Sequence, residues 1–384
     1  MTFNTLIKAQ YKGNIGSNEI VFLCGARDFH AMDWYRSALK IMHERDVVIL
    51  TDLIESEGFK RLINDKDVVY KLLVIDRILF KGQSRKGDIW RNIVKAVIFP
   101  IQVMLLWLFA RNHKGAVYHA HSMYYLWLAW AAGLEYIGIP QGSDILVKPL
   151  KSNIYRVLSA AALKAAKAVS VDSKIMAEYV YKMAGIKAAI IQNGIDVNAI
   201  NTTINGYGKI DQMRYNITSF RGLTPLYNII NIIHSRNASS KYCEQPVNLI
   251  YPFYEQEYAI SVRSDLRSFD RDFGRVDRSE IYRNFLSTLL AISIPTSDSS
   301  PRSVYEAIFC GAAVALTYHP FIDDMPECMK SRIIIIDLQN TKWFDDALDK
   351  AIQITKEPFC PSLTALDMFD QERSLLRLLN LVAF

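Results

Sequence analysis

The sequence repeats one pattern along most of its length: a short apolar run, a polar or glycine-marked break, and a stretch with helical periodicity. Apolar runs of strand length lie at residues 19–24, 46–50, 70–75, 115–121, 168–173, 188–196, 214–220, 246–253, 289–294 and 332–338. Strands that alternate with helices in this way predict parallel sheets covered by helices on both faces. Because 384 residues exceed what one ordinary core accommodates, we expect an α/β protein with two Rossmann-like domains.

One polar segment divides the two sets of units. Residues 201–212, NTTINGYGKIDQ, are rich in Asn and Gly and interrupt the apolar pattern, which predicts an interdomain linker. The N-terminal domain would then comprise residues 1–200 and the C-terminal domain residues 213–360. A helix within residues 361–384 is expected to pack back on the N-terminal domain.

Charge and cysteine usage limit the function classes. Residues 1–200 carry 26 Lys and Arg against 17 Asp and Glu, which favours an anionic partner such as a membrane surface or a phosphorylated substrate. No basic run is interleaved with aromatic residues, so we expect no nucleic-acid partner. The five cysteines are scattered and contain no C-x-x-C pair, which predicts reduced thiols, no zinc site and a cytoplasmic protein. The first residues lack the apolar core of a signal peptide.

The most apolar segment is AVIFPIQVMLLWLFA, residues 96–110, with Arg91, Lys95, Arg111 and Lys114 on its flanks. Its fifteen residues fall short of the roughly 20 that span a bilayer. Two interpretations are open: a helix buried against the sheet, or a helix that lies in the membrane interface with its basic flanks on anionic lipid. The second would make the protein peripheral on the inner face of the cytoplasmic membrane.

A proline-marked turn follows the apolar strand at 289–294. The pattern places Ser299 or Ser300 as a helix cap and Pro301 in the first helical turn, where its missing N–H costs nothing. The helix RSVYEAIFC would end at Gly311. Such a turn can also do no more than cap the helix, without binding a ligand.

The start of this helix predicts an anion site. Backbone N–H groups of Arg302, Ser303 and Val304 would point into the crevice where the preceding strand ends, which suits a diphosphate. Glu306 lies one turn further along and can accept hydrogen bonds from the vicinal diol of a ribose. The turn is therefore predicted to hold a nucleotide.

Polar residues follow other strands at the same kind of position. They are Gly25, His119, His121, Asp144, Ser173 and the Asn193-Gly194 pair. Parallel sheets bind ligands at the carboxyl ends of their strands. His121 can bind a sugar hydroxyl or accept its proton, or it can be a buried histidine bonded to backbone. His119 is expected to be structural, and Asp144 either orients an acceptor hydroxyl or caps the next segment.

The spacing Ser297-Asp298, Pro301, Glu306-Ala307, Gly311 resembles the donor-site signature of the GT-B glycosyltransferases of family 4, which are retaining and use nucleotide sugars. Asp298 and Glu306 are eight residues apart, as the two acids of that signature are. Further pieces resemble the family in order along the chain: His119 to His121, Gly142 to Asp144, Val171 to Ser173, and Gln192 to Asp196. The resemblance covers roughly residues 20–355.

The resemblance implies two Rossmann-like domains facing across a cleft, with the acceptor on the N-terminal domain and the sugar nucleotide on the C-terminal one. It implies His121, Asp298 and Glu306 as catalytic residues, donor contacts from Arg221, Gly222 and the turn at 300–306, and an acceptor side with Gly25 and Asp144. No metal is expected, because the helix dipole and basic side chains carry the leaving diphosphate. The chain departs from the pattern in having Asp298 as its first acid, Arg221-Gly222 for the usual Lys-Gly, and Gln141 where a His is common.

These features predict a metal-independent hexosyltransferase that moves a sugar from a UDP- or GDP-sugar to a glycan or polyprenyl-diphosphate-linked glycan, in the synthesis of a bacterial surface polysaccharide such as O-antigen or capsule. Two alternatives share the architecture: a sugar-nucleotide epimerase, and a non-catalytic partner that retains only the fold. The sequence leaves open the base, the sugar, the acceptor, the linkage and the oligomeric state.

Overall fold

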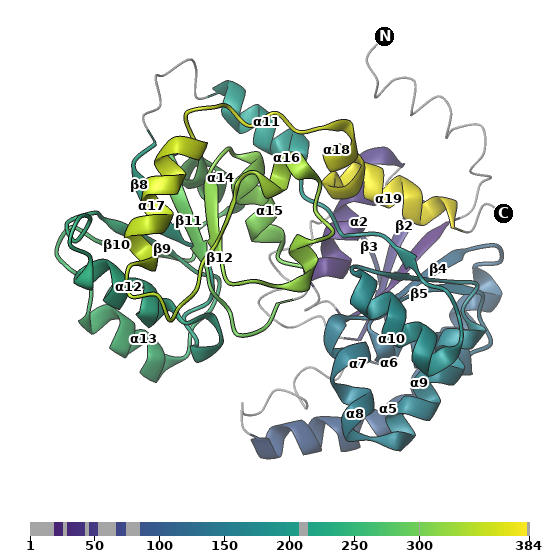
Figure 1. The fold of residues 1–384 in the computed structure, drawn as a ribbon. Helices are drawn as coiled ribbons and strands as arrows, with labels where there is room; N and C mark the ends of the chain where they lie inside the picture. The colour runs from purple at the N-terminus through teal and green to yellow at the C-terminus, as the bar shows by residue number, and fades with distance from the viewer. Residues whose placement is uncertain are drawn as a thin grey trace, which may run out of the picture. The chain divides into compact units, whose positions relative to one another are not determined.

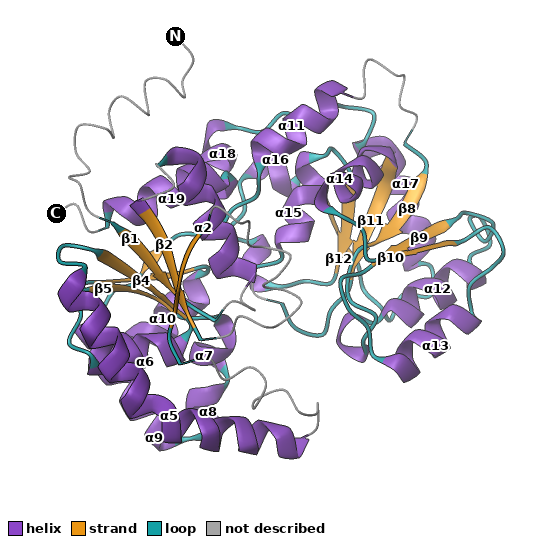
Figure 2. Ribbon diagram, turned by 180° about the vertical axis from the view of Figure 1, so that it is seen from behind, coloured by secondary structure: helices purple, strands orange, loops and turns teal. Residues whose placement is uncertain are grey.

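The structure is a computed structural model that describes residues 19–25, 29–42, 46–52, 67–73, 85–206, 214–298 and 300–381. The chain forms two compact units (Figures 1 and 2). The N-terminal unit contains the residues up to Asn193 together with those from Gln371 onward, and the C-terminal unit contains Gly194–Asp370. The chain therefore passes between the units twice, at 193–194 and at 370–371, instead of once through a linker at 201–212.

The N-terminal unit is built on seven parallel strands in the order β3-β2-β1-β4-β5-β6-β7. The strands are β1 (Ile20–Leu23), β2 (Val47–Thr51), β3 (Val68–Lys71), β4 (Val117–His121), β5 (Tyr136–Ile139), β6 (Ala168–Val171) and β7 (Ala189–Ile190). The helices are α2 (Phe29–Ile41), α5 (Arg85–Asn112), α6 (Met123–Ala131), α7 (Gly142–Leu146), α8 (Lys148–Lys151), α9 (Asn153–Ala165), α10 (Lys174–Ala184) and α19 (Gln371–Asn380).

Alternate residues of β1 face opposite sides of this sheet, as the period of a strand requires. Val21 and Leu23 pack into a core with α5, α6, α9 and α10. Ile20 and Phe22 pack into a second core with α2 and α19, to which Leu375 and Leu378 contribute. Helices thus cover both faces, and the short apolar strands carry no polar outer face because neither side meets water.

The C-terminal unit has a six-stranded parallel sheet in the order β10-β9-β8-β11-β12-β13. The strands are β8 (Asn216–Ser219), β9 (Val247–Ile250), β10 (Arg271–Gly274), β11 (Thr288–Ser293), β12 (Ala313–Leu316) and β13 (Ile333–Ile335). The helical segments are α11 (Val197–Gly206), η2 (Pro225–Tyr227), α12 (Ile229–Ala238), α13 (Gln256–Ser264), α14 (Arg278–Ser287), α15 (Arg302–Phe309), η3 (Pro320–Ile322), α16 (Glu327–Lys330), α17 (Trp343–Ile354) and α18 (Leu363–Phe369).

This second unit corrects the predicted linker. Residues 201–206 belong to α11, which starts where the Asp196 carboxylate accepts a hydrogen bond of 2.9 Å from the Ala199 N–H. Val197 and Ile200 pack α11 into the core with α14 and α15. Burial of this apolar face outweighs the weak helix propensity of its Asn and Thr residues. Residues 207–212 of the predicted linker lie outside the described ranges.

The apolar stretch at 96–110 forms part of a 28-residue helix, α5, with Pro100 inside it. The helix is only partly buried: Leu106 packs into the core of the unit, but only 17% of the window within Ile93–Asn112 is buried. By length and composition this helix passes the test for a candidate membrane span.

Candidate donor and acceptor sites

The topological switch point of the C-terminal sheet lies between β8 and β11. From β8 the chain builds β9 and β10 on one side and then returns to place β11, β12 and β13 on the other. In open α/β sheets, ligands bind outside the carboxyl ends of the strands at such a point. Arg221 and Gly222 follow β8, and the turn that carries Asp298 follows β11. The structure therefore brings these predicted donor residues to the switch point.

Arg221 connects the two loops at this point. One guanidinium nitrogen donates to the Asp298 carboxylate at 2.6 Å, and another donates to the Ser303 hydroxyl at 3.1 Å. The guanidinium also lies over the ring of Tyr227, 4.6 Å from its centroid. The side chains of Arg221 and Asp298 are only 11% and 14% exposed. A cation is thus fixed at the start of α15, in a geometry that a phosphate group can contact.

Helix α15 starts at Arg302 with Pro301 as its N-cap, and the proline side chain makes no capping hydrogen bond. Ser300 is therefore not the N-cap, and its hydroxyl lies 3.4 Å from the Tyr305 hydroxyl. The alternative cap, Ser299, lies outside the described residues, so the predicted serine cap stays a prediction. The Val304 N–H donates to the Pro301 carbonyl at 2.9 Å. This bond closes the first turn and engages the Val304 N–H, one of the three amides predicted to contact an anion.

Gly222 is required at its position by a close approach. A Cβ atom there would lie 2.4 Å from the ring of Phe253, far inside van der Waals contact. The Leu223 N–H donates to the Phe253 carbonyl at 3.1 Å, which fixes the loop after β9 against the loop after β8. A side chain at 222 would displace the Phe253 ring from the switch point.

Glu306 is buried on α15, with 6% of its surface exposed. Its carboxylate accepts a hydrogen bond of 3.2 Å from the Tyr282 hydroxyl and lies 3.8 Å from the Arg278 guanidinium. Burial, and then the negative charge of Glu306, raises the pKa of Tyr282 well above its usual range, so the tyrosine stays a hydrogen-bond donor. Tyr282 and Arg278 were not predicted as contacts of Glu306, because nothing in the local sequence around them indicates a partner that lies more than 20 residues further along the chain.

The N-terminal sheet has a switch point of its own, between β1 and β4. Gly25 lies just beyond the end of β1 and is buried. His119 and His121 lie in β4. Ser122, the next residue, has φ 67° and ψ 154°, a conformation that costs a non-glycine residue on the order of 1–3 kcal/mol. Such strain clusters at ligand sites, and the pattern of this loop did not reveal it.

His121 is buried, with its ring stacked 5.7 Å from that of Phe22. Its Nε2 atom is buried and has no hydrogen-bond partner in the described part of the chain. Burial lowers the pKa of His121 well below its usual range, and His119 and His30 lower it further. His121 is therefore neutral at pH 7, and an unprotonated ring nitrogen can accept a hydrogen bond from a hydroxyl, although the same burial makes the ring a weak base.

His119 is fully buried beside Phe22, and neither ring nitrogen has a hydrogen-bond partner among the residues described. Burial lowers the pKa of His119 to about 4. The unfolded chain would bind a proton near pH 6.5, whereas the folded chain would not do so until about pH 4. Between these values the unfolded state binds more protons, so stability falls as the pH falls.

Acidification from pH 6.5 to 4 should therefore cost the N-terminal unit on the order of 3 kcal/mol through His119. Urea unfolding across this range, followed for the wild type and His119→Leu, measures it. The variant should show a flatter pH dependence of the free energy of unfolding than the wild type. Equal slopes in wild type and His119→Leu would contradict the assignment.

Asp144 is not available to an acceptor. Its carboxylate, 1% exposed, accepts hydrogen bonds from the N–H groups of Met123 (2.8 Å) and Gln141 (3.2 Å). It also accepts from Lys148 at 2.7 Å and from the Tyr155 hydroxyl at 3.1 Å. Four donors occupy both oxygens, so the acceptor role is replaced by a structural one: Asp144 caps α7 and fixes it to α6 and α9.

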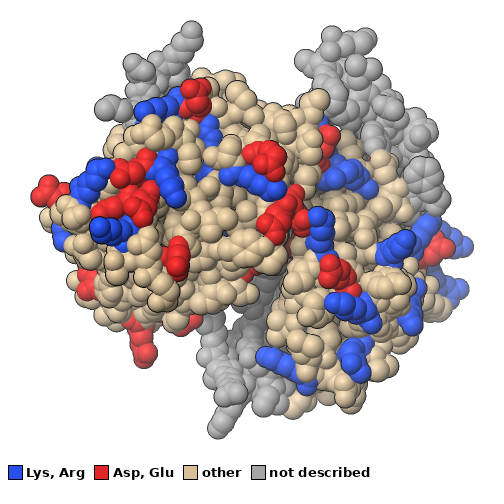
Figure 3. Space-filling view, in the orientation of Figure 1, with Lys and Arg blue, Asp and Glu red and all other residues tan. Residues whose placement is uncertain are grey.

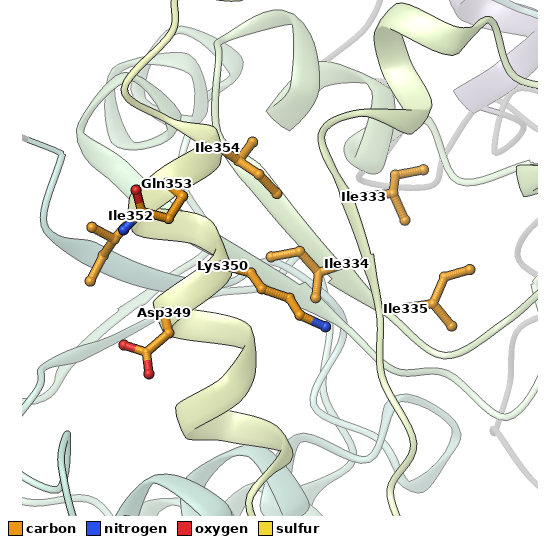
Figure 4. Close-up of a pocket in the computed structure, with 8 residues that line it drawn as sticks. All are labelled: Ile333, Ile334, Ile335, Asp349, Lys350, Ile352, Gln353 and Ile354. Carbon is orange, nitrogen blue, oxygen red and sulfur yellow. The ribbon is translucent and has the colours of Figure 1, made fainter.

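A hollow of about 760 Å³ lies elsewhere, between the edge strand β13 and helix α17. Figure 4 shows its lining of isoleucines from β13 opposite residues 349–354 of α17. The carboxylate there, Asp349, is bonded to Lys241 and Tyr242. This apolar hollow at the sheet edge is not where a nucleotide would bind. No group of three or more His, Cys, Asp or Glu residues able to hold a metal ion occurs in the described ranges.

The fold was compared with known proteins. No protein-family model matches the chain, and no curated protein sequence matches it. Solved structures do match: HepE of Anabaena in complex with UDP has a TM-score of 0.67 at 14% identity over 94% of this chain and 98% of that one. An α,α-trehalose-phosphate synthase (UDP-forming) of Burkholderia vietnamiensis has a TM-score of 0.67 at 11% identity, over 96% and 99% of the two chains.

A glycosyltransferase of Rickettsia africae gives a TM-score of 0.65 at 12% identity, over 95% of this chain and 98% of that one. These likenesses extend over both units and over nearly the whole length of each neighbour. They confirm the predicted α/β fold with two Rossmann-like units. The resemblance to family 4 in particular stays a prediction. The chain has the GT-B fold of these glycosyltransferases.

Proposed function

We propose that the protein is a glycosyltransferase that transfers a sugar from a nucleoside diphosphate sugar to a hydroxyl of a glycan. The observation that carries this proposal is Arg221, fixed between Asp298 and Ser303 where β8, β11 and the start of α15 meet. HepE, a structural neighbour, binds UDP and UDP-glucose, which supports a uridine nucleotide as the first donor to test.

In this reaction the bond between the anomeric carbon and the phosphate oxygen breaks, and the acceptor oxygen forms the new glycosidic bond. Negative charge develops on the leaving diphosphate. Arg221 and the first amides of α15, Arg302 and Ser303, supply positive charge and N–H donors there. Asp298 holds Arg221 in position, and Glu306 is proposed to bind the ribose. On the acceptor side, neutral His121 is proposed to accept the hydroxyl proton.

The finer proposals rest on the sequence. Retention of the anomeric configuration, independence of metal, and a role in surface polysaccharide synthesis follow from the resemblance to family 4. A lipid-linked glycan as acceptor is inferred from the basic N-terminal half and the apolar helix with its basic flanks, and a cytoplasmic location from the scattered cysteines without a C-x-x-C pair. Product analysis by NMR, which reports the anomeric configuration directly, tests the first of these.

Nucleotide binding tests the donor site. Calorimetry with UDP, GDP and ADP should show one nucleotide that binds, and Glu306→Gln should weaken it by about 1–3 kcal/mol, or roughly 5- to 150-fold. Because Glu306 also contacts Tyr282, thermal unfolding of the variant must show that the fold is retained. Glu327→Gln, at a carboxylate 87% exposed on α16, is the matched control.

Each outcome separates the alternatives. No binding of any nucleotide by the wild type would contradict the proposal. Conversion of the sugar nucleotide without an acceptor would identify an epimerase instead. Absence of nucleotide binding would favour the non-catalytic partner.

A further inference from the structure

The outer face of α5 is apolar. Five side chains at helical spacing line it: Ile93, Val97, Ile101, Met104 and Leu108, which are 51%, 70%, 46%, 53% and 44% exposed. The window within Ile93–Asn112 has a mean hydropathy of 2.2 and is only 17% buried. A helix that packed only on the core of its own unit would present polar side chains to solvent. The exposed apolar face of α5 therefore indicates a binding partner outside the unit.

Helices α8 and α9 expose a second apolar set beside it. Leu150, Ile154 and Val157 are 74%, 75% and 64% exposed. Helix α6 contacts both α5 and α9, and α5, α6 and α9 pack into the same core on one face of the sheet. Figures 1 and 2 both draw α8 and α9 next to α5. The two apolar sets therefore belong to one layer of helices.

Polar contacts fix the inner face of α5 to this layer. Gln102, fully buried, donates to the Asp52 carboxylate at 3.0 Å and accepts from the Tyr124 hydroxyl at 2.5 Å. The other oxygen of buried Asp52 accepts from Tyr125. Removing α5 from the unit would leave a buried carboxylate with one partner fewer and expose the core around Leu106. Helix α5 is thus held on the unit and does not leave it to cross a bilayer.

Charge identifies the occupant of this surface. Residues 93–114 and 147–167 contain no Asp or Glu. They contain Lys95, Arg111, Lys114, Lys148, Lys151, Arg156, Lys164 and Lys167, of which all but Lys95 are exposed. In Figure 3 more blue than red side chains lie over this unit. A second copy of the chain would bring the same cations against these, whereas anionic lipid headgroups would complement them.

We propose that the outward faces of α5, α8 and α9 form a docking surface for an anionic lipid bilayer. The apolar side chains insert among the headgroups, and the Lys and Arg side chains contact lipid phosphates. This arrangement is interfacial and involves no spanning helix. The proposal goes beyond the proposed transfer reaction and does not depend on it.

Co-sedimentation of the purified full chain with vesicles tests the surface. We expect binding to mixed phosphatidylcholine and phosphatidylglycerol vesicles, weaker binding to phosphatidylcholine alone, and release by high salt. Leu150→Glu with Ile154→Glu should reduce binding at least tenfold, because both side chains are exposed and the substitutions put carboxylates at the lipid phosphates. Leu363→Glu with Ile260→Glu, at residues 74% and 57% exposed in the other unit, should bind as the wild type does.

Several results would overturn the proposal. One is a wild type that does not bind anionic vesicles at all, and another is an equal loss of vesicle binding in both double variants. A third contrary result is protein that stays on the vesicles in high salt, as a protein with a spanning helix would. Sedimentation velocity tests a further alternative. If the wild type self-associates and Leu150→Glu with Ile154→Glu makes it a monomer, the surface binds a second copy of the chain. Nucleotide binding, measured on the same samples, should be unchanged, so failure here is distinct from failure of the donor site.

Discussion

Arg221→Ala should lower kcat/KM for sugar transfer by about 10²- to 10³-fold, the usual effect of removing one donor to charge that develops in a transition state. Arg221 is largely buried, and it is fixed by Asp298 and Ser303 at the start of α15. Its cation would therefore face the leaving diphosphate without having to reorganise. Steady-state kinetics with the nucleotide sugar identified by calorimetry measures the effect.

The variant also leaves the Asp298 carboxylate without its cation, and this must be separated from the loss of catalysis. Arg221→Ala with Asp298→Asn removes the unpaired charge and should remain as slow as the single variant. Arg221→Lys should recover part of the rate, since it keeps the charge but not the two fixed contacts. Arg283→Ala, at an arginine 42% exposed on α14, is the matched control. Full activity of Arg221→Ala would place the leaving group elsewhere.

Arg236→Met should destabilise the C-terminal unit by about 3–5 kcal/mol, because it leaves a buried carboxylate unpaired. The side chains of Arg236 and Asp270 are both fully buried and form a two-pronged ion pair. The same carboxylate accepts from the N–H groups of Val247 and Arg267, each at 2.8 Å. The pair thus fixes α12 and the turn before β10 to the start of β9.

Denaturant unfolding with a probe in the C-terminal unit measures this loss, since the two units need not unfold together. Arg236→Met with Asp270→Leu removes both charges and should recover only part of the stability, because the N–H groups of Val247 and Arg267 lose their acceptor. A loss below about 1 kcal/mol in the single variant would show that water reaches Asp270 and that the pair behaves as a surface ion pair.

Features with a local signal were predictable from the sequence. Strands buried on both faces read as unbroken apolar runs, so β1, β2 and β11 were located to within a few residues. The acids and glycines at strand ends led to the switch points because parallel strands gather their carboxyl ends at one edge. The proline-marked turn before α15 led to Arg302, Ser303 and Glu306 for the same reason.

Features that depend on distant partners were not predictable. For Asp144 the sequence left two roles open, an acceptor contact and a helix cap, and only the donors from Met123, Lys148 and Tyr155 on its oxygens show that it is a cap. The segment at 201–206 has the composition of a loop, but it continues α11, which packs against α14 and α15 through Val197 and Ile200. In both cases tertiary contacts outweigh what the local composition favours.

The return of the chain to its first unit affects how the protein is synthesised. Helix α19 supplies Leu375 and Leu378 to the core that contains Phe22 and α2, yet it is translated after the whole of the second unit. While the ribosome makes residues 194–370, the early unit lacks this cover and its apolar sheet face is open to chaperones or to other nascent chains. Domains usually fold in the order of their synthesis; here the later unit is complete first, and the last turns of the chain close the earlier one.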